Sequence, residues 1–215
     1  MRHAIAQNPE GFWPNLGMQW FHAYRGDEAA ALDYGRRAFA INPRVSFVLS
    51  VLRDHELRAG RQTEARALYA KAYPGLLNDS KPKIDGANYR SAIDLALVLS
   101  KTGEQGRVDM LLNSSLQHIQ TFSRLGDDGY RIADVQIYAL QGEKKKALSA
   151  LRQAIDAGWR GIWWYYLKHD PILDSIHDEP EFQAMVQEIE ADMTAQLARL
   201  GELELEGSEA ADSTL

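Results

Sequence analysis

The 215-residue sequence contains no cysteine. This absence excludes disulfides, thiolate metal sites and a cysteine nucleophile, but both reducing and oxidising compartments tolerate it. The compartment is therefore left open by this chemistry. We expect a cytoplasmic location, or a periplasmic one if a membrane anchor precedes the chain.

Long apolar runs and an excess of basic residues are also missing. The longest apolar candidates are "FVLSVL" and "GIWWYYL", far short of the roughly 20 residues that span a bilayer. Thirty acidic residues against 24 basic ones give a net charge of −6, which provides no electrostatic footprint for a phosphate backbone. We expect no membrane insertion and no direct contact with nucleic acid.

Enzyme motifs are scarce. The sequence contains no G-x-G-x-x-G, no G-x-x-x-x-G-K-[ST] and no G-x-S-x-G, and its "HELRA" stretch lacks the second histidine of a zinc-binding helix. We therefore expect a protein that is not an enzyme and that uses no cofactor and no metal.

The stretch "HDPILDSIHDEPE" gathers residues of metal-ligand type around His169 and His177. An acidic side chain before a proline is also typical of a helix start, because the proline's missing N–H costs nothing in the first turn. We favour two helix starts, at Asp170 and at Glu179. A small enzyme that uses His169 and the neighbouring acids is the alternative.

A constant spacing of 34 residues is the clearest feature that is present. "RHAIAQNP" at residues 2–9 recurs as "RRAFAINP" at residues 36–43, and Gly26 and Ala31 recur as Gly60 and Ala65. Self-similarity at such a period is the signature of a repeat array. The first stretch is then the second half of a repeat, which predicts that the chain is the carboxy-terminal part of a longer protein. A lone helix 2–7 acting as a cap is the alternative.

Each unit predicts two helices joined by a turn. Gly26 ends the first helix, Asp27 caps the second, and Pro43 closes the unit. Small residues four and three apart lie on one face of the second helix, where they allow a neighbouring helix to approach closely; they are Ala31, Gly35 and Ala38.

These units resemble the tetratricopeptide repeat family. The match is carried by "YRGDEAAALDYGRRAFAINP" and by "LRAGRQTEARALYAKAYP", although Pro74 comes early in the second. The resemblance implies an all-α superhelix of helix pairs. We expect a partial repeat at 1–11, repeats at about 12–45, 46–79, 89–122 and 128–158, a helical capping segment at 159–200 and a flexible acidic tail at 201–215. A loop after Pro74 inserts nine residues into the period.

The capping segment carries a second resemblance. Gly158-Trp159, Asp170-Pro171-Ile172-Leu173-Asp174 and Pro180-Glu181-Phe182 are similar to the segment that ends the array in many bacterial regulatory proteins. This resemblance implies a sensory or interaction module of a bacterial regulator, with an amino-terminal output domain such as a winged-helix activator or a nucleotide cyclase. In helix 181–200 an apolar stripe is expected to cover the end of the stack. We expect the aromatic residues of "WRGIWWYY" to pack between the last repeat and the cap, with a ligand-stacking platform as the alternative.

In the tetratricopeptide family the first helix of each pair lines a concave surface on which peptides bind. Carried over to this sequence, the candidate groove residues are Trp13, Leu16, Trp20, Phe47, Ser50, Asp54, Ile93 and Leu97. The groove would be apolar and aromatic, without the Lys, Arg and Asn residues with which some members grip a terminal carboxylate. We expect a protein or peptide partner that supplies an amphipathic helix or hydrophobic segment, or another domain of the same polypeptide. A self-contained scaffold or assembly factor is the alternative to the regulatory module.

Overall fold

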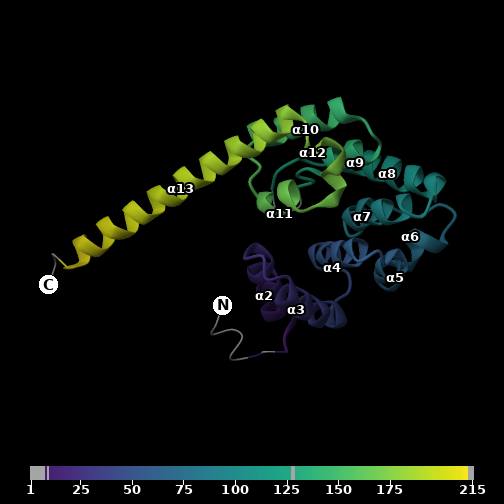
Figure 1. The fold of residues 1–215 in the computed structure, drawn as a ribbon, viewed down its shortest axis with the longest axis horizontal. Coiled ribbons are helices and arrows are strands. Elements are labelled where there is room, and N and C mark those ends of the chain that lie inside the picture. Colours follow the sequence, from purple (N-terminus) through teal and green to yellow (C-terminus); the bar gives the residue numbers. More distant parts are fainter. Residues whose placement is uncertain (1–7, 9, 127–128, 213–215) are drawn as a thin grey trace.

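The computed structural model of the protein describes residues 8, 10–126 and 129–212, with side chains described as far as residue 200 (Figure 1). Every regular element in these ranges is a helix, so the predicted all-α fold class is confirmed. The predicted helix 2–7 lies outside the described residues. None of the helices in the described part combines the length and the apolar character that crossing a membrane would require.

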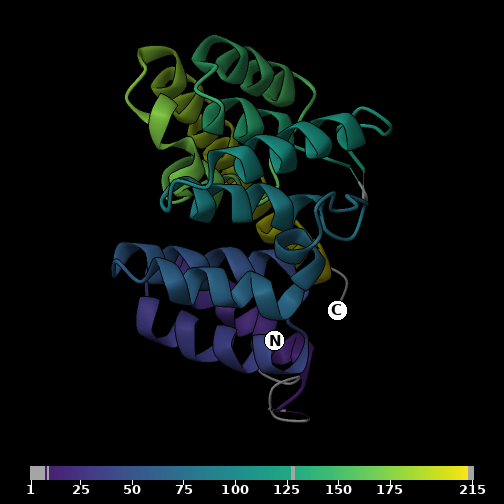
Figure 2. The ribbon, with the colours of Figure 1, turned by 90° about the vertical axis from the view of Figure 1, so that its right-hand side faces the viewer.

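Four pairs of helices follow one another along the chain. The pairs are α2 (Phe12–Tyr24) with α3 (Glu28–Ile41), α4 (Ser46–Arg58) with α5 (Gln62–Ala72), α7 (Tyr89–Ser100) with α8 (Gln105–Ile119), and α9 (Ala133–Leu140) with α10 (Lys144–Asp156). The two members of each pair pack on each other. Neighbouring pairs are also in contact, since α3 packs on α4, α4 on α7, and α7 on α9. Figure 2 shows α2 to α5 stacked below the later helices.

The turn inside each pair is built on a glycine in the left-handed region. Gly26, Gly60, Gly103 and Gly142 have φ values of 73°, 71°, 79° and 74°. After each glycine, the next backbone N–H donates to the carbonyl five residues earlier, as from Asp27 to His22 and from Glu143 to Tyr138. This is the Schellman arrangement that ends helices. The Asp27 carboxylate accepts from the N–H of Ala30 at 3.2 Å, so its predicted role as a helix cap is confirmed.

The small-residue face of α3 lies against α2, as expected from the sequence. Ala31 and Ala38 are buried, and a Cβ atom built on Gly35 would lie only 2.6 Å from Nε2 of Gln19. The missing side chain of Gly35 therefore sets how closely α2 and α3 approach.

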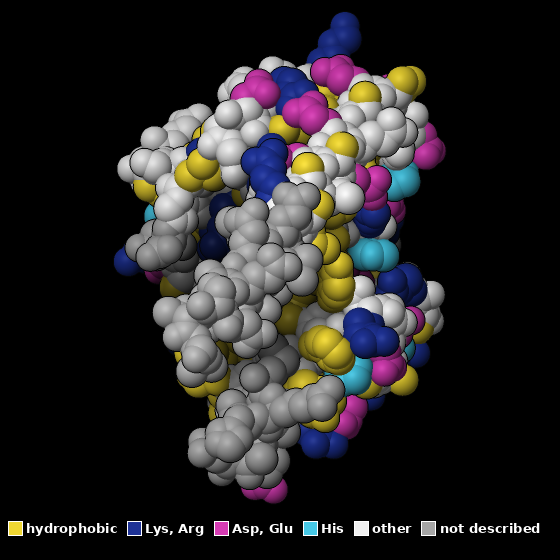
Figure 3. Space-filling view, turned by 90° about the vertical axis from the view of Figure 1, so that its left-hand side faces the viewer, with side chains coloured by type: hydrophobic (Ala, Val, Ile, Leu, Met, Phe, Trp, Pro, Cys, Tyr) yellow, Lys and Arg dark blue, Asp and Glu magenta, His cyan; other side chains and the backbone are white. Residues whose placement is uncertain are grey.

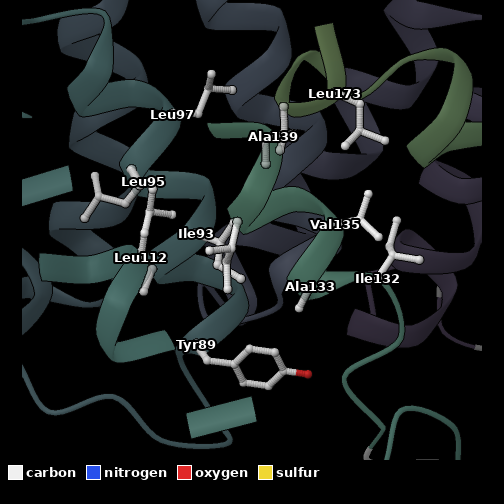
Figure 4. Packing of buried hydrophobic residues seen from close by; sticks show 14 of the residues in the cluster. Tyr89, Ile93, Leu95, Leu97, Leu112, Ile132, Ala133, Val135, Ala139 and Leu173 are labelled. Atoms are coloured by element: carbon white, nitrogen blue, oxygen red, sulfur yellow. The ribbon is translucent and has the colours of Figure 1, made fainter. Parts of the chain in front are cut away.

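The core is a continuous cluster of apolar side chains that runs through the helix pairs. Figure 4 shows part of it, where Leu97 of α7 lies near Ala139 of α9 and Val135 lies near Ile132. Because each pair contributes to the same cluster, the packing is continuous along the stack.

The predicted loop after Pro74 begins with a short helix, α6 (Pro74–Asn78). Pro74 occupies the first turn of α6, where a proline lacks no needed hydrogen bond. The remaining insertion, residues 79–88, connects α6 to α7 without a further helix.

The capping segment contains α11 (Trp163–Lys168), the 3-10 helix η1 (Pro171–Leu173), α12 (Asp174–His177) and the long helix α13 (Pro180–Asp212). The helix α13 packs on α10. Four residues near its start are buried, namely Phe182, Met185, Val186 and Ile189. Further along the predicted stripe, Leu197 is 71% exposed. Residues 201–212 continue the helix where the sequence predicts a frayed tail, and residues 213–215 lie outside the described part. The Glu, Leu and Ala residues of 201–212 are strong helix formers.

Candidate functional site

Six of the eight candidate groove residues are buried: Leu16, Phe47, Ser50, Asp54, Ile93 and Leu97. Trp13 and Trp20, in contrast, are 76% and 39% exposed. Leu16, Ile93 and Leu97 belong to the apolar core. Asp54 and Phe47 of α4 are in contact with a later segment of the chain.

That segment is α11 together with η1. The Tyr165 hydroxyl of α11 donates to the Asp54 carboxylate of α4, and the rings of Tyr165 and Phe47 are 5.1 Å apart. Asp170, which precedes η1, contacts Arg53 of α4. Residues 163–173 therefore fold back onto the second helix pair, whereas the sequence predicts a segment that covers only the end of the stack.

Arg53 is the centre of this contact, and its side chain is fully buried. Its Nε donates to Asp54 Oδ1 at 2.7 Å, its Nη1 to Asp94 Oδ1 at 2.5 Å, and its Nη2 to Asp170 Oδ1 at 2.9 Å. These three carboxylates come from α4, from α7 and from the start of η1. We call Arg53, Asp54, Asp94 and Asp170 the Arg53 cluster.

Polar side chains complete the hydrogen bonding of the Arg53 cluster. Ser50 Oγ donates to Asp94 Oδ2 at 2.7 Å, and the Tyr69 hydroxyl lies 3.4 Å from the same oxygen. Gln136 Nε2 of α9 donates to Asp170 Oδ2 at 2.8 Å. Buried charges are tolerated when they are paired and hydrogen-bonded in this way. The cluster thus joins α4, α5, α7, α9, α11 and η1.

Burial changes the protonation of the Arg53 cluster. It raises the pKa of Asp54 to about 7, against the attraction of Arg53, and it also raises the pKa of Asp94. Although burial works in the opposite direction, the attraction of the three carboxylates holds the pKa of Arg53 well above its ordinary value. Burial likewise raises the pKa of Tyr165 well above its usual range. Arg53 is therefore charged, and the Asp54 carboxyl binds a proton at a higher pH than an exposed aspartate does.

A cavity of about 220 Å³ lies beside the cluster, between α3, α4 and α11. Asp54 and Tyr165 line it from the cluster side, and Trp164 and His169 line it from the capping segment. Burial, followed by the nearby Arg58 charge, lowers the pKa of His169. The cavity brings solvent within reach of one cluster member, Asp54.

Aromatic rings connect α2 to the same region. Trp20 packs on Phe47 at a centroid distance of 5.0 Å, and Tyr24 packs on Trp164 at 5.3 Å. Trp164 and Tyr165 are neighbours in α11, and Tyr165 also packs on Phe47. The rings thus link α2, α4 and α11 along the side on which the capping segment folds back.

Part of this aromatic surface is open to solvent. Trp13, Trp20 and Tyr24 are seven and four residues apart, so they share one face of α2. Trp13 is 76% exposed and Tyr24 is 69% exposed. We call these three residues the α2 stripe. Figure 3, which views the side of the molecule on which α2 lies, shows hydrophobic side chains gathered near the middle of the face.

The acidic residues of "HDPILDSIHDEPE" and the aromatic residues of "WRGIWWYY" are the other candidates from the sequence. The side chain of Asp170 accepts from the N–H of Ile172 and begins η1, and Pro180 begins α13, so both predicted helix starts are confirmed. Within the described residues, no group of three or more His, Asp and Glu side chains is arranged to hold a metal ion. In "WRGIWWYY", Trp159 and Tyr165 are buried, and Tyr165 contacts the second helix pair.

Sequence reasoning missed Arg53 and Asp94, and it missed the contact of Asp170 with Arg53, since Asp170 was predicted only as a helix start or a metal-ligand type residue. Asp94 did leave a signal, because it is the only charged residue in "SAIDLALVLS", a run whose other members are mostly apolar. A charge on a helix face of that kind is rarely buried without a partner. The sequence identifies no partner for Asp94, because Arg53 lies 41 residues away from it in the chain. Arg53 and Asp170 are even further apart, at 117 residues.

Comparisons with protein-family models, with curated proteins and with solved structures found no match to this chain.

Proposed function

We propose that the protein is a non-catalytic interaction module of the tetratricopeptide type, which binds a hydrophobic or amphipathic helical segment of a partner protein on the α2 stripe. The observation that carries the proposal is the exposure of Trp13 and Tyr24 on the same face of one helix. Aromatic side chains provide much of the binding energy where proteins meet. The end-of-array resemblance of residues 158–182 favours a regulatory setting for the module.

The helix pairs support the tetratricopeptide assignment. Their turns share a left-handed glycine followed by the same backbone hydrogen bond, and the first helices of the later pairs, α4, α7 and α9, pack in series. Serial packing of helix pairs is how such repeats build an extended binding face. The distance in sequence from Gly26 to Gly60 fits the length of one repeat.

The surroundings of Trp20 support a partner with apolar side chains. A second cavity, of about 350 Å³, lies between Trp20 and two other segments, one that includes Leu125 and one that includes Ile162. Trp20 and Leu125 are both 39% exposed. An exposed patch that combines rings, an aliphatic side chain and a hollow is typical of a surface that binds another protein. A scaffold or assembly factor would use the same surface.

The proposal is tested by site-specific photocrosslinking in cells that produce the protein. A photoreactive amino acid at position 13 is compared with one at position 197, because Leu197 is as exposed as Trp13 but lies on α13. We expect position 13 alone to capture a defined hydrophobic helical segment. If that segment belongs to another domain of the same polypeptide, the regulatory module is supported; if it belongs to a separate protein, the scaffold is supported.

The captured segment is then titrated against purified variants. Trp13→Ala and Tyr24→Ala should each weaken its binding about tenfold or more, as expected for aromatic residues at the centre of an interface. Leu197→Ala serves as the matched control and should leave binding unchanged. Identical crosslinks from positions 13 and 197, or equal binding by all three variants, would contradict the proposal.

A further inference from the structure

The Arg53 cluster contains more negative than positive charge. One guanidinium faces the carboxylates of Asp54, Asp94 and Asp170, and no second Lys, Arg or His side chain pairs with these carboxylates among the described residues. With all three carboxylates ionised, the buried group would carry two uncompensated negative charges. Carboxylates that share a buried site do not all ionise together near neutral pH, and they titrate as a coupled group.

The charged and titratable groups around Asp54 come from every element packed against it. They are Arg53 of α4, Tyr69 of α5, Asp94 of α7, Tyr165 of α11 and Asp170 before η1, with Glu28, Arg58 and His169 across the neighbouring cavity. Glu28 is already paired with Arg58 at 2.7 Å. Among the described residues, Arg53 is therefore the only cation that pairs with the three cluster carboxylates.

Two members of this group belong to the segment that folds back. Tyr165 contacts Asp54, and Asp170 contacts Arg53, so residues 163–173 are attached to the second helix pair through the cluster. Asp54 also lines the cavity of about 220 Å³, which gives it a route for exchanging a proton with solvent. Asp54, which takes up the proton, therefore also makes one of the contacts that attach residues 163–173 to α4.

We propose that the Arg53 cluster is a proton-controlled latch, which holds residues 163–173 against α4 and α9 tightly when the cluster carries a bound proton and loosely when that proton is lost. This inference is independent of the proposed function, because it concerns only how the chain binds its own capping segment.

The direction of the pH dependence follows from the pKa of Asp54. In the closed structure burial raises this pKa to about 7, whereas a solvent-exposed Asp54 has the ordinary value of 3.8. The closed state therefore binds a proton that the open state lacks. The full stabilisation is present below the ordinary pKa, is lost progressively as the pH rises to about 7, and changes little above that.

Hydrogen–deuterium exchange of the whole chain tests the latch. After correction for the intrinsic effect of pH on exchange, the opening constant of residues 163–173 should rise about tenfold for each pH unit from about pH 5 to about pH 7 and level off near pH 8. In Asp54→Asn, which cannot ionise at this position, the rise should be markedly smaller. Asp33→Asn is the matched control, since it removes the exposed pair with Arg37, and it should follow the wild type.

NMR of the aspartate side-chain carboxyl carbons in the wild-type protein provides a second measurement that does not depend on any variant folding. We expect one aspartate to titrate near pH 7. The latch is overturned if every aspartate titrates below about pH 5, or if exchange in residues 163–173 of Asp54→Asn has the same pH dependence as in the wild type.

Discussion

Two large polar side chains, Arg53 and Gln19, are fully buried in this fold. Arg53 is fully buried with three carboxylates around it, and Gln19 is fully buried between α2 and α3. The two residues differ in their partners. Arg53 uses its guanidinium nitrogens in hydrogen bonds, whereas neither amide atom of Gln19 has a hydrogen-bond partner among the residues that the structure describes. A buried polar group of this kind lowers stability.

We predict that Gln19→Met stabilises the protein. Methionine has nearly the shape of glutamine but no amide to desolvate, so the free energy of unfolding should rise by about 1 kcal/mol. Urea denaturation followed by circular dichroism measures the change. Gln187→Met, at an exposed position of α13, is the control and should alter stability by less than about 0.5 kcal/mol. A loss of stability in Gln19→Met would show that the Gln19 amide makes a favourable contact.

At the level of the elements, the sequence predicts most of the helix pairs. The turn glycines and the Asp27 cap are local signals, because a left-handed residue after a helix and an acceptor before the next one act within a few residues of chain. The structure places Gly26, Gly60, Gly103 and Gly142 in the expected turns. The helix in residues 201–212 was not predicted, because this stretch is acidic and lacks a sustained apolar stripe, although its Glu, Leu and Ala residues favour a helix.

The turn conformation leads to a prediction for Gly142. A Cβ atom built on Gly142 meets nothing within 4 Å, so only its φ of 74° opposes a side chain. Gly142→Ala should therefore lower the free energy of unfolding by about 1–2 kcal/mol, the cost of placing an L-residue in the left-handed region.

Gly106→Ala is the matched control for this change. Gly106 lies in the first turns of α8, also has nothing within 4 Å of a built Cβ atom, and is not among the glycines with positive φ. The same substitution should there be neutral or should stabilise the protein by up to about 1 kcal/mol, because alanine favours a helix more than glycine does. Chemical denaturation of both variants decides the matter, and equal losses would rule out backbone strain at Gly142 as the cause.

At the scale of the whole molecule, the Arg53 cluster joins parts of the chain that the repeat pattern leaves separate. Arg53 of the second pair binds Asp94 of the third pair and Asp170 of the capping segment. Gln136 of the fourth pair also binds Asp170, and Tyr165 of the capping segment binds the second pair. A helix stack is normally stabilised by contacts between neighbouring pairs. This chain adds contacts between residues that are more than 100 positions apart in the sequence.

We predict that Arg53→Met is strongly destabilising. It removes the one cation and leaves three buried carboxylates, so the free energy of unfolding near neutral pH should fall by about 3–5 kcal/mol. The loss should be smaller near pH 5, where the raised pKa values of Asp54 and Asp94 favour protonation of the remaining acids.

Thermal and urea denaturation at both pH values provide the measurement. Arg37→Met is the control, because Arg37 and Asp33 form an exposed pair that should contribute less than about 1 kcal/mol. Similar losses in Arg53→Met and Arg37→Met, or a loss in Arg53→Met that does not depend on pH, would contradict the role assigned to the cluster.

The sequence by itself determined the helical class, the paired helices, the glycine turns and the helix starts at Asp170 and Pro180, because each of these depends on residues close together in the chain. Only the tertiary structure decided that α11 and η1 fold back onto α4. It thereby also decided that Asp54 is buried while Trp13 stays exposed. The physical reason is that a contact such as Arg53 with Asp170 joins residues 117 positions apart. No local periodicity encodes such a contact.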